Sequence, residues 1–272
     1  MFKKIAFVGA GSMAEALIAG MIKAKMLAPA QITVTNKSNQ ARLQALSKKH
    51  QVKTTPSTEE AIANADAVIF AMKPKDIVSA LIEVKPYLQP SQLIISILAG
   101  TLIALFTERL QQDNPVIRTM PNTSATIGYG ATAMTAGEFV TSDQLEQTKQ
   151  LFETVGKVSI VEEEQMHVVT AVSGSGPAYF YYIVEAMEKA ATKNGLEADV
   201  AKSLIYQTIL GAAEMLQQTD LEPTELRNNI TSPNGTTQSG IEALIDHKVE
   251  DGIEAAICAA MKRSKELGEL KK

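Results

Sequence analysis

Three stretches of this sequence combine glycine with small polar residues, a pattern that suits phosphates and other small anions. The first is GAGSMA, residues 9–14, which follows a short apolar run. The others are SGSGPAYFY, residues 173–181, and ITSPNGTTQSG, residues 230–240. The stretch 230–240 carries no charge and interrupts a region of helical periodicity. Its hydroxyl and backbone N–H groups are the donors that a small anion requires.

The first stretch has the G-x-G-x-x-A spacing of a dinucleotide-binding turn. Gly9 permits the tight turn, Gly11 lets a pyrophosphate approach the backbone, and Ala14 keeps the helix close to the strand. The phosphates then meet unpaired N–H groups at the helix start. The position after an N-terminal strand pattern makes the motif informative. The residues expected to bind the dinucleotide here are Gly9, Ala10, Gly11, Ser12 and Met13.

The end of the next apolar run indicates which dinucleotide is bound. An NAD site usually places Asp or Glu there, to accept hydrogen bonds from the ribose 2′-hydroxyl. Here the run ends in TNKS, residues 35–38, without a carboxylate. Asn36 and Ser38 can donate hydrogen bonds to a 2′-phosphate, Lys37 adds a positive charge, and no carboxylate repels the phosphate. The sequence therefore favours NADPH as the cofactor, with NADH as the alternative.

These stretches need a sheet to position them. The runs KKIAFV, QITVTN, DAVIFAM, QLIISIL and PVIRTM are short, rich in Ile and Val, and mostly apolar on both faces. Such runs are typical of a parallel sheet that is covered on both sides. Helical patterns alternate with them, at residues 12–25, 39–50, 58–65, 75–87 and 102–112. This alternation predicts a doubly wound sheet with right-handed crossovers.

Open sheets of this kind bind ligands at the carboxyl ends of their strands. One such end is AMKP, residues 71–74, and the next is SILAG, residues 96–100. The segment RTMPNT, residues 118–123, follows the sixth strand and is expected to face the same cleft. Lys73 and Ala99 are candidates for the nicotinamide-ribose side. The additional cofactor-binding candidates are Ala71, Met72, Lys73, Ala99 and Asn122.

After Val161 the strand pattern stops and helical patterns follow. They cover residues 178–194, 199–218, 237–247 and 249–267. The helix near Ala201 is apolar almost all round, which indicates burial or cover by a partner chain. The sequence therefore predicts an α/β fold with two parts. Residues 1–163 form an N-terminal Rossmann-type doubly wound sheet, an NADP-binding domain, and residues 164–272 form a C-terminal all-α domain for dimerisation and substrate binding.

Composition argues against several other classes of protein and of binding site. The apolar share of 45% and the charged share of 21% are those of a globular protein. The net charge of −4 gives no electrostatic case for nucleic acid. The single cysteine, Cys258, excludes an internal disulfide, and the three histidines have no ligand spacing, so no metal is expected. No run reaches membrane-spanning length, and the run after the N-terminal lysines is too short for a signal peptide. We therefore expect a cytoplasmic protein.

Taken in order, the motifs FVGAGSMAEAL, AMKP, MPNT, SGSGPAYFY and TSPNGTTQSG resemble the pyrroline-5-carboxylate reductase family, from Ile5 to about Leu244. The resemblance implies reduction of L-1-pyrroline-5-carboxylate to L-proline with NADPH or NADH, the last step of proline biosynthesis. It also implies homodimers through the helical domain, which can assemble into a larger ring such as a decamer. One departure is Asn234, which stands where the family commonly has a glycine; Asn tolerates left-handed backbone better than most residues.

The resemblance also implies roles for individual residues. Ser232 and the backbone around Gly235 and Thr236 would hold the substrate carboxylate, and Thr237 would lie near the ring nitrogen. Glu163, within VEEEQ, corresponds by spacing to a substrate-side acid, although three successive glutamates equally fit a solvated helix start. The implied substrate-binding residues are Glu163, Ser232, Gly235, Thr236 and Thr237. Of these, Ser232 and Thr237 are the expected catalytic residues.

Three other functions fit the sequence less well. A hydroxyacid dehydrogenase of similar architecture needs a Lys or His base, commonly a lysine on the interdomain helix. The corresponding stretch, PAYFYYIVEAMEKAA, has no basic residue in its first turns. A non-catalytic NADP sensor would bind NADPH without consuming it. A dimeric regulator of other proteins has no sequence feature in its favour.

Overall fold

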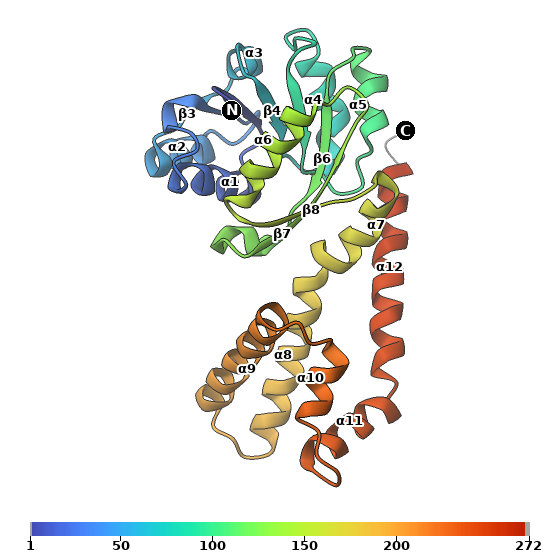
Figure 1. Cartoon of the computed structure of the whole chain (residues 1–272). Coiled ribbons are helices and arrows are strands. Elements are labelled where there is room, and N and C mark those ends of the chain that lie inside the picture. The colour runs from blue at the N-terminus through green and yellow to red at the C-terminus, as the bar shows by residue number, and fades with distance from the viewer. Residues whose placement is uncertain (1, 270–272) are drawn as a thin grey trace. The chain divides into compact units, whose positions relative to one another are not determined.

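The computed structural model describes residues 2–269. The chain divides into two compact units. The first, which we call the sheet unit, contains Met1–Pro177 and Ala259–Lys272. The second, the helical unit, contains Ala178–Cys258. The elements of both are labelled in Figure 1.

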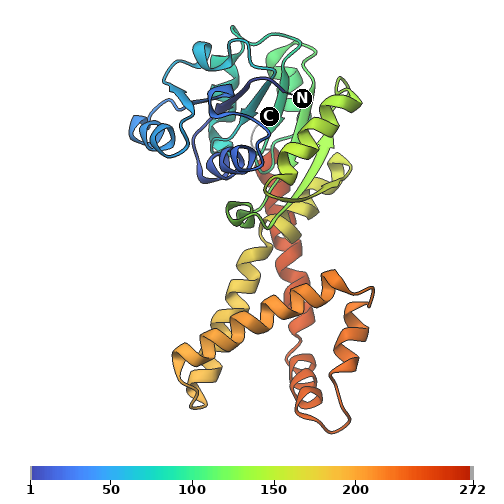
Figure 2. The same ribbon diagram turned by 60° about the vertical axis from the view of Figure 1, so that its left-hand side comes forward.

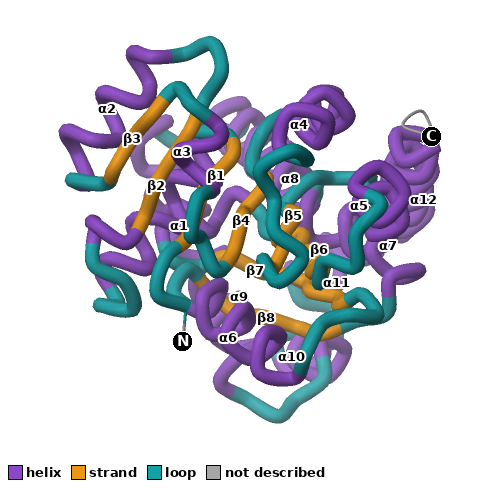
Figure 3. The backbone as a smooth tube through the Cα atoms, turned by 90° about the horizontal axis from the view of Figure 1, so that it is seen from above, coloured by secondary structure: helices purple, strands orange, loops and turns teal. Residues whose placement is uncertain are grey.

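The sheet unit is built on one eight-stranded sheet, whose strands lie in the order β3-β2-β1-β4-β5-β6-β7-β8 (Figure 3). The strands β1 to β6 are parallel, β7 runs antiparallel to β6, and β8 runs parallel to β7. Their bounds are β1 (Ile5–Val8), β2 (Ile32–Thr35), β3 (Lys53–Thr55), β4 (Ala67–Phe70), β5 (Leu93–Ser96), β6 (Val116–Met120), β7 (Gly130–Ala136) and β8 (Gly156–Ile160).

Helices cover both faces of this sheet, which confirms the predicted doubly wound arrangement. Successive side chains of a strand point to opposite faces, so Ile5 and Phe7 of β1 enter one apolar cluster and Ala6 and Val8 enter the other. The first cluster is completed by α1 (Ser12–Lys23), α2 (Gln40–His50) and α6 (Ser142–Glu153). The second is completed by α3 (Thr58–Ile62), α4 (Ile77–Val84) and α5 (Ile103–Leu110).

The helices begin where the sequence supplies side-chain caps. The side chain of Asn39 accepts a hydrogen bond from Arg42 N at the start of α2, and Ser57 caps α3 in the same way. Thr141 and Gln144 form a reciprocal capping box at the start of α6. Each cap satisfies a backbone N–H that the helix itself leaves without a partner. Short 3-10 turns occur at Pro29–Gln31, Pro74–Asp76, Thr123–Ile127 and Glu163–Gln165.

The sheet unit is discontinuous in sequence. After β8 come α7 (Met166–Val169) and a π-helical turn at Thr170–Gly174, and the unit is completed by the last part of α12 (Val249–Glu269). His167 Nδ1 lies 3.0 Å from Ser264 Oγ, which joins α7 to α12. A Cβ built on Gly100 would lie 2.9 Å from the Ser264 carbonyl oxygen, so α12 packs closely on the chain after β5. The division into units groups residues 164–177 and 259–269 with the sheet, whereas the sequence predicts a helical domain that begins at 164.

The helical unit contains α8 (Gly176–Lys193, of which 178–193 belong to it), α9 (Ala198–Gln218), α10 (Pro223–Asn229), α11 (Thr236–Asp246) and the first part of α12 (Figure 2). Ala201 and Ile205 are its buried apolar residues on α9. Many large apolar side chains of the unit are exposed; they include Phe180, Tyr181, Tyr182, Leu204, Tyr206, Leu210, Met215, Leu216, Leu244, Ile245 and Ile253. Among the described helices, none is both long and apolar enough to cross a membrane.

Candidate functional site

The glycine turn joins β1 to α1 and has the close approach that the sequence predicts. Gly9 has a φ of +112°, and a Cβ built there would lie 2.5 Å from the carbonyl of Ala71. Its N–H donates to the Thr35 carbonyl at 2.9 Å, which ties the turn to β2. Gly11 is the N-cap of α1, and none of the described side chains caps this helix. The first N–H groups of α1 therefore remain available to a phosphate.

Two cavities lie at this end of the sheet. The larger, which we call the main cavity, has a volume of about 850 Å³. The smaller, the side cavity, has a volume of about 380 Å³ and lies at the end of β2. The main cavity is lined by residues 9–13, Asn36, Ser38, Asn39, Arg42, 71–76, 97–99, Met120 and Pro121. The side cavity is lined by Val8, Gly9, 35–38, Thr58, Met72, Asp76, Ser79, Ala80, Glu83 and Val84.

The structure brings together nearly all of the residues that the sequence analysis assigns to the cofactor. The main cavity contains Gly9, Ala10, Gly11, Ser12, Met13, Asn36, Ser38, Ala71, Met72, Lys73 and Ala99. Lys37 lines the side cavity, which shares Gly9, Asn36 and Ser38 with the main one. A glycine cradle that a Cβ would fill, beside an uncapped helix start, fits a dinucleotide pyrophosphate.

Asn122 is placed differently. Its Nδ2 donates to the Ser173 carbonyl at 3.3 Å, and its Oδ1 accepts from Ala131 N at 3.2 Å. It lines neither the main nor the side cavity. Its amide therefore joins the MPNT segment to the SGSG segment and to β7, which is a positioning role within the sheet unit.

A carboxylate reaches the end of β2 from another element. Asn36 Oδ1 accepts from Ser38 N (3.1 Å) and Asn39 N (2.9 Å), which fixes the turn. Lys37 is 81% exposed, and its Nζ lies 3.6 Å from Glu83 Oε2 of α4. The end of β2 itself carries no carboxylate, as predicted, but Glu83 of α4 lies within reach of Lys37. The reason is tertiary: the fold places the last turn of α4 beside the end of β2.

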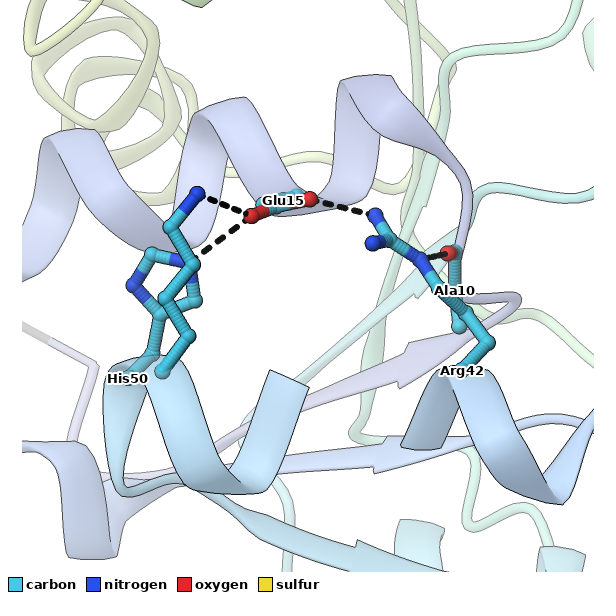
Figure 4. Close-up of polar contacts among 5 residues, drawn as sticks. Ala10, Glu15, Arg42 and His50 are labelled. Atoms are coloured by element: carbon cyan, nitrogen blue, oxygen red, sulfur yellow. Dashed lines mark hydrogen bonds and ion pairs between the residues drawn. The ribbon is translucent and has the colours of Figure 1, made fainter. Parts of the chain in front are cut away.

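Arg42 lines the main cavity and was not among the predicted residues. Its Nε donates to the Ala10 carbonyl at 2.8 Å, and its Nη2 donates to Glu15 of α1 (Figure 4). Glu15 also accepts from Lys49 (2.8 Å) and contacts His50 Nε2 (3.1 Å). Hydrogen bonds from Lys49, Arg42 and His50 lower the pKa of Glu15 to about 2, against the opposing effect of burial. The cluster fixes Arg42 against the glycine turn.

Glu163 is held by groups of the sheet unit. Its Oε1 accepts from Arg118 Nη1 at 3.1 Å and from Ile103 N at 2.8 Å. The Arg118 side chain is only 2% exposed. Burial lowers the pKa of Arg118, and the hydrogen bond that Arg118 donates to Glu163 opposes this shift. Glu163 also lines a cavity of about 460 Å³ together with His167 and Lys265.

The predicted substrate turn lies in the helical unit, at the start of α11. Asn234 has a φ of 57°, the left-handed conformation that a glycine would otherwise supply. Gly235 N donates to the Ser232 carbonyl at 3.0 Å, and Asn234 N donates to Gln238 Oε1 at 2.8 Å. None of the described side chains caps α11, whose N-cap is Gly235. The fold thus gathers Ser232, Gly235, Thr236 and Thr237 into one turn at an uncapped helix start.

Two family models match the chain. The model described as pyrroline-5-carboxylate reductase dimerisation covers residues 163–267. The model described as NADP oxidoreductase, coenzyme F420-dependent, covers residues 4–100, which contain the glycine turn and the end of β2.

Individual relatives extend the similarity to almost the whole chain. Pyrroline-5-carboxylate reductase 1 of Bacillus spizizenii is 44% identical over 267 residues, which is 98% of this chain and 90% of that protein. Pyrroline-5-carboxylate reductase 2 of Bacillus subtilis is 43% identical over 98% of this chain and 96% of its own length.

Solved structures of similarly named proteins have a similar fold. The pyrroline-5-carboxylate reductase of Coxiella burnetii has a TM-score of 0.90 at 36% identity and covers 97% of this chain and 98% of its own. The Plasmodium falciparum pyrroline carboxylate reductase, solved with NADP bound, has a TM-score of 0.88 at 32% identity, with the same coverage. The chain therefore belongs to the pyrroline-5-carboxylate reductase family of oxidoreductases.

Proposed function

We propose that this protein reduces L-1-pyrroline-5-carboxylate to L-proline with NADPH or NADH, as the last step of proline biosynthesis. The observation that carries the proposal is the uncharged turn at the start of α11. Its hydroxyl and N–H donors suit one carboxylate on a small ring, and they carry no charge that would retain the product. The names of the two Bacillus relatives support the same substrate.

The cofactor-binding residues follow from the main and side cavities. Residues 9–13 would receive the pyrophosphate at the start of α1, and Lys73 and Ala99 would lie on the nicotinamide-ribose side. Asn36, Lys37 and Ser38 would meet the ribose at the end of β2. Asn122 would act indirectly, by holding the segment that ends β6. When bound, the reduced nicotinamide supplies the hydride that C5 of the imine receives.

The turn at 232–237 would bind and orient the substrate. Ser232 and the N–H groups of Gly235 and Thr236 would hold the carboxylate, since a helix start favours an anion. Thr237 would orient the ring nitrogen and relay a proton to it through water. A protonated imine is the better electrophile, and the nitrogen ends as an amine, so no strong acid is needed. Holding two reactants in a reactive pose can supply roughly 7–11 kcal/mol.

The helical unit would form the interface of a homodimer, which can assemble into a decameric ring. The exposed apolar side chains on α8, α9 and α11 support this, because a lone chain rarely presents so much apolar surface to water. The dimerisation model that matches residues 163–267 supports it as well. Sedimentation equilibrium would measure the assembled mass. The proposed compartment is the cytoplasm.

The test of the reaction mixes purified protein, NADPH and L-1-pyrroline-5-carboxylate and follows the loss of reduced-cofactor absorbance, with NADH in parallel. Proline should appear in an amount equal to the cofactor consumed. A reaction without the imine controls for background oxidation, and a 2-oxo acid in its place tests the hydroxyacid dehydrogenase alternative. Binding of NADPH without consumption would identify a sensor and contradict the proposal.

A further inference from the structure

The side cavity holds a carboxylate that has two different partners. Glu83 Oε1 accepts a hydrogen bond from Thr58 Oγ1 of α3 at 2.5 Å, while Glu83 Oε2 lies 3.6 Å from Lys37 Nζ. The Glu83 side chain is 38% exposed. The carboxylate is therefore fixed by α3 on one side and faces solvent and the exposed Lys37 on the other.

The charge of this cavity does not suit a phosphate. Among the described residues that line it, Asp76 and Glu83 are acidic and Lys37 is the one cation. Lys37 is already paired with Glu83. Arg42 of the main cavity, which shares Asn36 and Ser38 with this one, is engaged by Glu15 and by the Ala10 carbonyl. A 2′-phosphate dianion would therefore have to take Lys37 away from Glu83, whereas a ribose hydroxyl could simply donate to a carboxylate.

We propose that Glu83 is a specificity-determining residue for the adenosine ribose of the cofactor. By holding Lys37, it weakens the binding of NADPH and so keeps NADH a usable reductant. This inference rests on the proposed function in one respect, the binding of a nicotinamide dinucleotide at the glycine turn. Sequence inspection at the end of β2 misses this determinant, because Glu83 comes from α4.

The test uses the full-length protein without substrate, and isothermal titration gives the Kd of NADPH and of NADH. Glu83→Gln keeps the size of the side chain and an oxygen that Thr58 can donate to, but it removes the charge that holds Lys37. We expect the Kd of NADPH to fall by no more than about fivefold, since the exposed ion pair that is broken is weak, and the Kd of NADH to change by less than about twofold. Equal changes for the two cofactors, or none, would overturn the inference.

Two further variants test how Glu83 acts. Glu59→Gln removes the same charge from α3, outside the side cavity, and should leave the ratio of the two Kd values within about twofold. Lys37→Met combined with Glu83→Gln should abolish most of the gain for NADPH, because the released cation is absent. A full gain in the double variant would refute the role assigned to Lys37.

The outcomes separate this inference from the proposed function. If the wild-type protein binds neither dinucleotide, the proposed function fails. If it binds both and Glu83→Gln leaves their ratio unchanged, only the inference about Glu83 fails. Glu83→Ala provides a second variant, in case Glu83→Gln does not fold, and should shift the ratio in the same direction. Far-UV circular dichroism and the Tm establish that each variant is folded.

Discussion

Arg118 Nη1 donates to Glu163 Oε1 over 3.1 Å, and the same carboxylate oxygen accepts the N–H of Ile103 at 2.8 Å. Ile103 is the first residue of α5, whose N-cap Leu102 offers no side-chain oxygen. One carboxylate thus neutralises a buried cation on β6 and satisfies a helix N–H. These contacts give Glu163 a structural role, whereas its spacing in the sequence suggests the substrate side.

Glu163→Gln should lower the free energy of unfolding by about 2–3 kcal/mol, because it leaves the Arg118 charge buried without a counter-ion. Urea denaturation measures this loss. Its matched control is Glu164→Gln, on an exposed neighbour, which should change stability by less than about 0.5 kcal/mol. A raised KM at unchanged stability would instead support the substrate-side role.

Glu15→Gln should destabilise the protein by about 1 kcal/mol at pH 7, since it removes the negative charge shared by Arg42, Lys49 and His50 and one of the two oxygens that accept from them. The folded pKa of Glu15, about 2, lies below the ordinary value of 4.5. Its contribution is therefore complete above pH 4.5 and is lost as the pH falls from there toward 2. Unfolding free energies of both proteins across this range should converge at low pH.

If the difference in unfolding free energy between the wild type and Glu15→Gln stays constant down to pH 2, the assigned pKa shift of Glu15 is contradicted. The control is Glu153→Gln on α6, which removes the partner of Lys149 in an exposed i,i+4 pair. Such pairs contribute about 0.3–0.5 kcal/mol, so this variant should have little effect at any pH.

Gly9→Ala should mainly lower the stability of the protein, whereas Gly11→Ala should mainly lower its affinity for NADPH. At Gly9 a Cβ would clash with the Ala71 backbone at a φ of +112°, so we expect a loss of about 2–4 kcal/mol in stability. At Gly11 the nearest atom would be 3.7 Å away, so folding should be affected by no more than about 1 kcal/mol. NADPH affinity of Gly11→Ala should still fall about tenfold or more, because the Cβ occupies the pyrophosphate approach.

Thermal unfolding and NADPH titration of the two glycine variants, run side by side, check this contrast. A Gly11→Ala protein that binds NADPH as tightly as the wild type would show that the pyrophosphate does not approach this turn.

Thr237→Ala should lower kcat by about tenfold to hundredfold and leave the Kd of NADPH nearly unchanged, because a misplaced substrate loses its alignment with the hydride. Steady-state kinetics and cofactor titration separate the two quantities. The control is Ser239→Ala, on the exposed side of α11, which should retain full turnover. Parallel losses of turnover and cofactor affinity would argue against a substrate role for Thr237.

Most of the parallel strands of the sheet could be predicted because each of these is a short apolar run that is visible within its own stretch of sequence. Strands β1, β2, β4, β5 and β6 are short apolar runs that are buried on both faces, and the predicted helices agree with the structure apart from their ends. The elements that the sequence did not predict are β3 (Lys53–Thr55), β7, β8, α6, α7 and α10. The three-residue β3 is partly exposed, and β7 consists of Gly, Ala, Thr and Met, which give no strong strand pattern. The capping box of Thr141 and Gln144 is a local signal from which α6 could have been found.

The candidate site divides in the same way. The glycine turn and the left-handed position at Asn234 are local, so both could be read from the sequence. Arg42 lies just inside the helix after β2, and its position there could have drawn notice as a phosphate partner. Glu83 could not be predicted, because only the folded sheet places α4 beside Lys37. Glu163 shows the same limit, since its partners Arg118 and Ile103 come from β6 and α5.

The discontinuous sheet unit has a consequence for biosynthesis. Residues 259–269 leave the ribosome only after all of Ala178–Cys258 has been translated. Until then, the nascent chain lacks the α12 backbone that packs on Gly100 and the Ser264 hydroxyl that contacts His167 in the folded protein. The nascent sheet can pair its strands early, but the surface beside β5 closes last, so an interrupted translation leaves that surface open to chaperones and proteases.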